Sequence, residues 1–134
     1  MPRIMLDTNI CIHAIKRNDP GVLGRLEKTR PQDVAISGVV AGELWTGVIK
    51  SHQRRRNEQA LAEFLAFVDV FDWPAGAARL YGEIRAELEI KGRPIGTMDL
   101  LIAAHAIHEQ ATLITRNSKE FQRISRLNIE GWEM

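Results

Sequence analysis

The sequence has few of the features that mark secreted or membrane proteins. Its single cysteine, Cys11, excludes an internal disulfide and favours a reducing cytoplasm. The apolar runs are short and interrupted by charge, which argues against a membrane-spanning helix. Asp7 breaks the first hydrophobic stretch, so we expect no amino-terminal signal segment. The expected location is therefore the cytoplasm, with no membrane as a partner.

A large charge of one sign is also missing. The chain carries 18 basic and 17 acidic residues, a formal net charge of +1, whereas nucleic-acid-binding proteins are more often strongly basic. A pocket that gathers carboxylates would, however, leave the remaining surface more basic than the total indicates. Composition therefore leaves nucleic acid open as a partner.

What is present fits one globular domain. A chain of 134 residues with 45% hydrophobic and 26% charged residues can bury a single continuous core. No internal repeat, linker or low-complexity segment divides it, so we expect one domain over residues 1–134.

Strand-like and helix-like segments alternate along the chain. Alternation of this kind predicts an α/β fold, a central twisted parallel sheet of about four to five strands with helices on both faces. Sites in such sheets form beyond the carboxyl ends of the strands. The expected strands are 3–6, 33–36, 68–73, 112–115 and 128–130, and the expected helices are 8–17, 22–28, 38–50, 57–68, 75–90 and 97–109.

Three carboxylates, Asp7, Glu43 and Asp99, stand in apolar surroundings where a strand ends or a helix begins. Carboxylates in such places are costly to bury unless they are paired. A divalent cation is the natural partner for clustered oxygen ligands, so the pattern predicts a metal-dependent site at one rim of the sheet.

Each acid also has a simpler interpretation. Asp7 is well placed to cap a helix, and Asp99 to complement a helix dipole in a first turn that Thr97 would cap. Glu43 is harder to explain in this way because its neighbours predict a largely buried helix. The coincidence of all three at one rim is what favours a functional site.

Other candidate residues carry weaker signals. His105 and His108 have the spacing of a zinc pair, but no third ligand stands near them, so a packed His105 and an exposed His108 are favoured. The run 54–56 of three arginines is either a solvated helix start or a phosphate-contacting patch. Basic residues that flank Asp99 are better placed to serve an acidic pocket: Arg85, Lys91, Arg93 and Arg116.

At these positions the chain resembles the PIN-domain ribonucleases, and specifically the VapC toxins of bacterial toxin–antitoxin pairs. Residues 5–10 (Met-Leu-Asp-Thr-Asn-Ile) are similar to the family's opening motif, and 37–44 to its second motif, with Glu43 as the acid. Segments 84–88 and 92–99 are similar to the third, with Asp99 as the acid, and 113–121 to the last. The motifs occur in the family's order between residues 3 and about 133.

The resemblance implies an endoribonuclease that depends on Mg²⁺, or on Mn²⁺. Asp7 and Asp99 would anchor the cation, with Glu43 as a further ligand or as the base for the attacking water. Thr8, Thr115 and Asn117 would orient water or ligands, and Arg85, Arg93 and Arg116 would hold RNA phosphates. Structured RNA such as tRNA is the implied substrate, and the stretch 92–96 is most similar to members that act on the anticodon loop of initiator tRNA. The implied partners are a homodimer mate and a VapB antitoxin, with DNA bound only through the antitoxin.

The chain departs from the family pattern at Asn117, where many PIN nucleases have a fourth acid. An amide oxygen still ligates a metal or orients water, but it adds no charge, which puts a tightly held second metal in doubt. Glu120, one helical turn later, is a candidate substitute acid.

Two other functions compete with the nuclease. An aspartyl-phosphate domain would also place Asp7 at the end of a first strand, but a phosphatase of that type needs an acid at position 9, which is Asn9 here. A catalytically weak or silent PIN module that acts with its antitoxin as a DNA-bound repressor is favoured only by Asn117.

Overall fold

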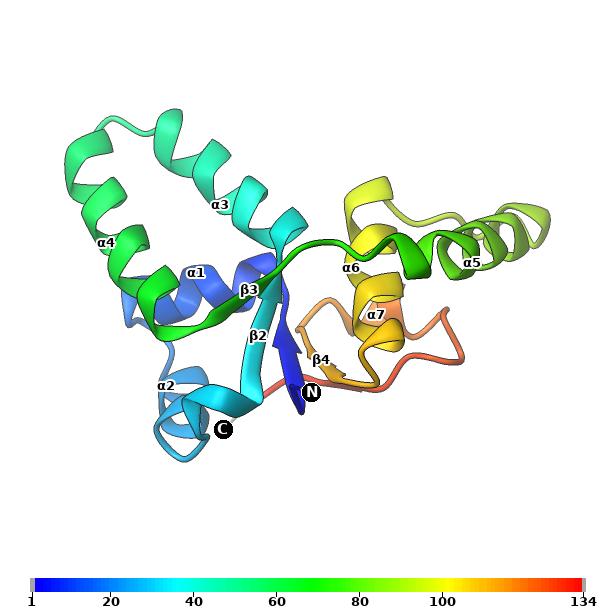
Figure 1. Cartoon of the computed structure of the whole chain (residues 1–134), viewed down its shortest axis with the longest axis horizontal. Coiled ribbons are helices and arrows are strands. Elements are labelled where there is room, and N and C mark those ends of the chain that lie inside the picture. Colours follow the sequence, from blue (N-terminus) through cyan, green and yellow to red (C-terminus); the bar gives the residue numbers. More distant parts are fainter. Residues whose placement is uncertain (1, 134) are drawn as a thin grey trace.

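Five parallel strands form one sheet in the computed structural model, which describes residues 2–133 (Figure 1). Their order across the sheet is β3-β2-β1-β4-β5, and Met5 of β1 lies opposite both Ala35 of β2 and Leu113 of β4. The predicted parallel α/β sheet is thereby confirmed. The strands are β1 (Ile4–Leu6), β2 (Val34–Ser37), β3 (Asp69–Phe71), β4 (Thr112–Ile114) and β5 (Ile129–Glu130).

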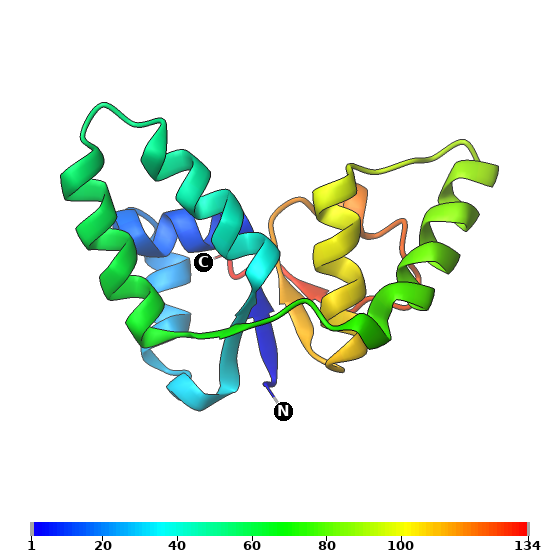
Figure 2. The same ribbon diagram turned by 45° about the horizontal axis from the view of Figure 1, so that its top comes forward.

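Helices cover both sides of this sheet (Figures 1 and 2). One group contains α1 (Thr8–Lys16), α2 (Pro20–Glu27), α3 (Gly38–Ile49) and α4 (Arg54–Phe67). The other contains α5 (Ala78–Ile90), α6 (Thr97–His108) and the short α7 (Ser118–Phe121). Single 3₁₀ turns, Pro31–Asp33 and Ala75–Ala77, precede β2 and α5. Within residues 2–133 no helix combines the length and the apolar character needed to cross a bilayer.

The direction of winding reverses between β1 and β4, and this reversal places the site. The connections from β1 to β2 and from β2 to β3 carry α1–α4, and the connection from β3 back to β4 carries α5 and α6. A crevice therefore opens beyond the carboxyl ends of β1 and β4, where ligands bind in sheets of this kind. Asp7 and Thr115 directly follow those two strands.

The core is built from the central strands and α6. Leu6, Ile36 and Leu113 are fully buried, as is most of α6 from Ile102 to Ala106. Strands covered on both faces read as continuous apolar runs, which explains why they could be predicted. His105 packs inside this core as expected, and burial lowers the pKa of its ring, while His108 is exposed.

Local chemistry sets the ends of two helices. Asp19 caps α2 by accepting from the backbone N–H of Val22 at 3.1 Å, and Pro20 occupies the first helical position. Beyond α5, Gly92 adopts a φ of +68°. The N–H of Arg93 then reaches the carbonyl of Leu88 at 2.8 Å, which ends the helix and turns the chain toward α6.

Several predicted boundaries were wrong. Thr97 does not cap α6: Gly96 occupies the cap position without a side-chain bond, and Thr97 is the first helical residue. Helix α2 begins at Pro20, two residues before the predicted start at residue 22, because Asp19 caps it. Helix α4 begins at Arg54, so the arginine run is an exposed helix start. Strand β3 ends at Phe71, two residues before the predicted end, and the Trp73 indole beyond it donates to the Leu101 carbonyl at 2.8 Å.

Candidate active site

Asp7 occupies the carboxyl end of β1 and is also the N-cap of α1. Its Oδ1 accepts from the backbone N–H of Ile10 at 2.9 Å, so the capping role and the site role coincide in one carboxylate. The side chain is only 6% exposed. Burial raises its pKa, hydrogen bonds from Thr115 and Ile10 oppose the rise, and the Glu43 charge adds to it. Asp7 is therefore a rigid, desolvated carboxylate.

Glu43 reaches the same rim from the second turn of α3. This helix starts directly after β2, where the Ser37 hydroxyl accepts from the N–H of Val39 at 3.2 Å. The Glu43 side chain is half-buried and is held by Thr8, whose hydroxyl donates to Oε1 at 2.5 Å. Because Thr8 engages one oxygen, the other carboxylate oxygen of Glu43 remains available to a ligand.

Asp99 enters from the opposite group of helices, in the first turn of α6. Burial, and then the charges of Glu120, Glu43 and Asp7, raise its pKa to about 6. Glu120 ranks first among these charges and belongs to α7. Three acids from different parts of the chain thus act electrostatically on Asp99.

Thr115 links the fourth strand to the first. Its buried side chain hydrogen-bonds the Asp7 carboxylate, and its Oγ1 accepts from the backbone N–H of Asn117 at 3.0 Å. Asn117 occupies the N-cap position of α7, but its side chain makes no capping bond there. The turn after β4 is thereby tied to Asp7 through Thr115.

The donor set fits a hard divalent cation in chemistry. All four acids offer oxygen ligands, and burial, together with the charges of neighbouring carboxylates, raises the pKa of Asp7 and of Asp99. Among residues 2–133, however, no three His, Cys, Asp or Glu side chains converge closely enough to form a ready coordination cage.

The three predicted RNA-binding arginines differ in their surroundings. Arg116 forms a bidentate pair with Asp19 and donates to the carbonyls of Gly131 and Trp132, each at 3.0 Å. Its guanidinium is therefore engaged in joining the carboxyl-terminal segment to the start of α2. Arg85 is exposed on α5 and donates to Glu89 and to the Tyr81 hydroxyl. Arg93 is exposed on the loop before α6.

Sequence reasoning missed two contacts that organise this region. The Asp19–Arg116 pair joins residues 97 positions apart, a separation that leaves no local pattern. Arg123 donates to the Pro94 carbonyl at 2.9 Å and so links the end of α7 to the loop before Asp99. Only the capping signature at Asp19-Pro20 could have marked the first of these contacts.

Comparison with known proteins assigns the fold to one family. The family model described as PIN domain matches residues 4–127. Ribonuclease VapC2 of Rickettsia felis is 46% identical over 130 residues, covering 96% of this chain and 97% of the relative. The tRNA(fMet)-specific endonuclease VapC of Shigella flexneri is 40% identical over 132 residues, covering 98% and 99%.

Solved structures agree with the sequence comparison. The DNA-bound VapBC complex of Salmonella typhimurium contains a chain that superposes with a TM-score of 0.92 at 37% identity, covering 98% of this chain and 99% of that one. The VapBC2 complex of Rickettsia felis bound to a promoter DNA fragment gives 0.90 at 45% identity, covering 97% and 98%. The chain therefore belongs to the PIN-domain family and, within it, to the VapC ribonuclease toxins.

Proposed function

We propose that this toxin is a Mg²⁺-dependent endoribonuclease, with Mn²⁺ as an alternative cation, that cleaves structured RNA, in particular tRNA. The observation that carries the proposal is the set of four acids in the crevice between β1 and β4, where burial and then repulsion from the other three acids raise the pKa of Asp99 to about 6. Arg116, which directly precedes Asn117 in the chain, is engaged by Asp19. The centre is thus built to receive a cation from solution.

We give the three central acids different roles. Asp7, fixed by Ile10 and Thr115, and Asp99, on the first turn of α6, would hold the cation between the two groups of helices. Glu43 would complete the ligand set or accept the proton of the attacking water through the oxygen that Thr8 leaves free. When bound, the cation would polarise the phosphodiester and favour ionisation of that water.

Asn117 and Glu120 are the two candidates for the role that a fourth acid has in many PIN nucleases. Asn117 would contribute only an amide oxygen, whereas Glu120 acts on Asp99 more strongly than the other two acids do. We assign Glu120 as the supporting acid and Asn117 as a positioning group for water or RNA.

We propose that Arg93 and Arg85, rather than Arg116, contact the RNA. Arg93 is exposed on the loop that leads directly into the turn carrying Asp99, so a phosphate held there would lie beside the acids. Relatives named as tRNA(fMet)-specific endonucleases at 40% and 38% identity support initiator tRNA as the target, and we propose that the cut falls in its anticodon loop.

An antitoxin is the proposed regulator, since similar solved structures are VapBC complexes. Two adjoining apolar clefts of about 500 and 280 Å³ lie along α1, α2, α3 and α4, and both include Ile15. They fit the apolar face of a helix from a VapB-type partner. A basic residue in its tail would enter the acidic centre and compete with the cation; DNA would be bound through this partner. The toxin itself is proposed to be a homodimer.

Cleavage of tRNA by the purified toxin tests the proposal. Wild type and an Asp72→Ala control, which changes an exposed acid after β3, should cleave initiator tRNA with Mg²⁺ or Mn²⁺. Asp7→Ala, Asp99→Ala and added EDTA should each reduce cleavage to background. Cleavage that survives EDTA would reject the metal mechanism.

The second candidate, a silent PIN module that represses transcription with its antitoxin, is favoured by Asn117 alone. Absence of cleavage beyond the two alanine variants, over several structured RNAs, would replace the nuclease with this function. Retained promoter binding by the toxin–antitoxin complex would then be its positive evidence.

A further inference from the structure

The loop 91–96 joins α5 to α6 and carries the exposed Arg93 (Figure 2). Its first part is fixed because the N–H of Arg93 donates to the Leu88 carbonyl at 2.8 Å. Its end is fixed because the N–H of Leu100 donates to the Gly96 carbonyl at 2.9 Å, at the start of α6. The two residues between Arg93 and Gly96 belong to neither helix, so their position depends on contacts with other parts of the chain.

Two contacts hold these residues. The Ile95 side chain is buried, and the Pro94 carbonyl accepts from the Arg123 guanidinium at 2.9 Å. The backbone of Arg123 is itself fixed: its N–H donates to the Glu120 carbonyl of α7 at 3.1 Å, and the next residue, Ile124, is buried. The bond therefore ties the middle of the loop to the chain segment that carries Glu120.

Arg123 makes this bond at a cost to the fold. Its Nε is buried and has no hydrogen-bond partner among residues 2–133. Glu87, an acid that borders the same small cavity, is paired with Lys91 at 3.0 Å. A buried polar group without a partner lowers stability, whereas an apolar side chain of similar length would not. The feature that distinguishes the arginine from such a side chain here is its bond to Pro94.

The position of Pro94 determines where Arg93 lies. A proline has a fixed φ and restricts the backbone of the residue before it, so a held Pro94 carbonyl also sets the backbone of Arg93. Arg93 is the exposed arginine proposed above to hold an RNA phosphate beside the acids. An arginine on a loop that is already ordered binds a phosphate without the loss of backbone freedom that ordering the loop would cause.

We propose that Arg123 is a positioning residue for the substrate: its bond to the Pro94 carbonyl keeps the loop ordered and presents Arg93 to an RNA phosphate. The inference rests on the proposed ribonuclease function, and specifically on the RNA contact of Arg93. Asp99 is held separately, because the buried Leu100 anchors the first turn of α6 in the core. Loss of Arg123 should therefore weaken RNA binding and leave the acids in place.

RNA binding by the full chain tests the proposal without cleavage when it is measured in EDTA. The probe is a fluorescent stem–loop RNA, the anticodon arm of initiator tRNA, followed by anisotropy; phosphate contacts do not depend on its sequence. Arg93→Gln should weaken binding by about tenfold, and Arg123→Met, which keeps the apolar stem, by about three- to tenfold. The double variant should lose about as much as Arg93→Gln alone, because both changes remove the same contact.

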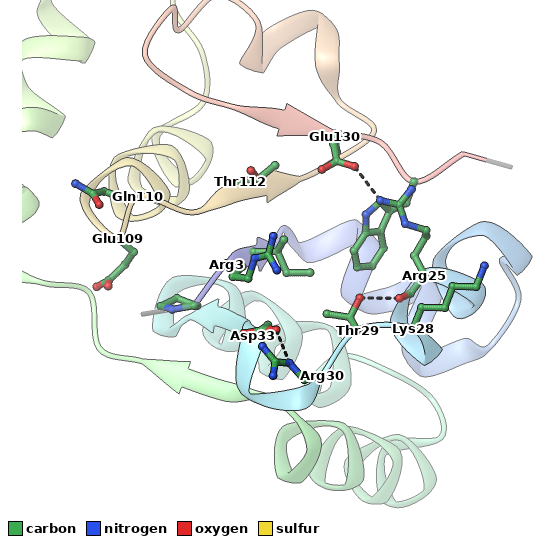
Figure 3. Close-up of a pocket in the computed structure, with 13 residues that line it drawn as sticks. Arg3, Arg25, Lys28, Thr29, Arg30, Asp33, Glu109, Gln110, Thr112 and Glu130 are labelled. Atoms are coloured by element: carbon green, nitrogen blue, oxygen red, sulfur yellow. Dashed lines mark hydrogen bonds and ion pairs between the residues drawn. The ribbon is translucent and has the colours of Figure 1, made fainter.

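Arg25→Met is the matched control. Arg25 pairs with Glu130 at 3.0 Å in a cleft at the amino ends of the strands, so this variant also loses one charge and a hydrogen bond (Figure 3). It should bind the RNA as wild type does.

Hydrogen exchange of the backbone gives a readout that involves no RNA. In Arg123→Met the N–H of Arg93, which donates to the Leu88 carbonyl, should exchange faster than in wild type. The N–H of Leu113, in the buried centre of the sheet, should keep its wild-type rate. Arg123→Lys keeps the charge, but its ammonium is shorter than the guanidinium fork, so it should show the same changes to a smaller extent. This second variant serves if Arg123→Met does not fold.

Cleavage separates this inference from the proposed function. With Mg²⁺, Arg123→Met should raise KM for RNA and keep kcat within about twofold of wild type. If wild type does not cleave, the nuclease is rejected, and the binding and exchange results still decide the role of Arg123. The inference is overturned if wild type binds no RNA, if Arg123→Met binds it as wild type does, or if the Arg93 N–H keeps its wild-type exchange rate. Losses that multiply in the double variant would also overturn it, because Arg123 would then act independently of Arg93.

Discussion

Removing the charge of Asp99 should stabilise the folded toxin. Burial of this carboxylate on α6, and then repulsion by Glu120, Glu43 and Asp7, raise its pKa from 3.8 to about 6. This difference corresponds to about 3 kcal/mol of free energy opposing ionisation in the folded state. Solvent screening and the favourable dipole at the start of α6 reduce it, so we expect Asp99→Asn to gain about 1–2 kcal/mol.

The gain in stability from Asp99→Asn should depend on pH. Because the folded-state pKa lies above the unfolded value of 3.8, ionised Asp99 weakens the fold fully only above about pH 6. Below the unfolded value both states are protonated and the penalty disappears. The stability difference between Asp99→Asn and wild type should therefore be largest near pH 8 and should shrink as the pH falls toward about 4.5.

Thermal unfolding in EDTA measures the effect. For a chain of 134 residues, a gain of 1–2 kcal/mol corresponds to a rise in Tm of about 3–8 °C. Asp72→Asn, which alters an exposed acid after β3, should leave Tm nearly unchanged. A variant less stable than wild type near pH 8, or an equal gain at both pH values, would refute the account of Asp99 as a repelled, desolvated carboxylate.

Three further predictions concern the groups around the acids. Thr8→Val should lower the rate of RNA cleavage by about tenfold or more while the protein stays folded, because Glu43 loses the hydroxyl that holds its Oε1; an unchanged rate would remove Thr8 from the site. Asn117→Asp should keep cleavage activity and lower the concentration of Mg²⁺ or Mn²⁺ needed for half-maximal rate, since it restores a charge; superimposable metal titrations would contradict a role for Asn117 at the metal. Asp19→Asn should lower Tm near neutral pH, because Arg116 and the Val22 N–H hold the pKa of Asp19 well below its ordinary 3.8. That stabilisation is complete above 3.8 and is lost as the pH falls below it, so a loss of Tm that is the same at acidic and neutral pH would disprove the assignment.

The sheet and its acids were predictable because their signals are local. The strands around Met5, Ile36 and Leu113 are buried on both faces and read as apolar runs. Asp7 ends such a run, and parallel winding then brings it to the same rim as Thr115. The position of the site thus follows from strand order.

The contacts that tune the site were not predictable, because they join residues distant in sequence. The hydroxyl of Thr8 could equally have capped α1, and only the packing of α1 against α3 turns it to Glu43. Arg116 directly precedes Asn117 and was therefore expected to face RNA, but it turns to Asp19 instead. Thr97 was expected to cap α6 because its residue type favours that position, yet the backbone places Gly96 there.

The order of the strands determines when, during synthesis of the chain, the acids can come together. The acids are spread from residue 7 to residue 120, and β4, which must lie beside β1 to close the crevice, is the fourth of five strands to be synthesised. A growing or truncated chain that lacks β4 leaves β1 as an open sheet edge and has no Glu120. With the active site proposed above, nuclease activity would emerge only when translation of the chain is nearly complete, which would give an antitoxin the whole time of synthesis to be present before the enzyme is formed.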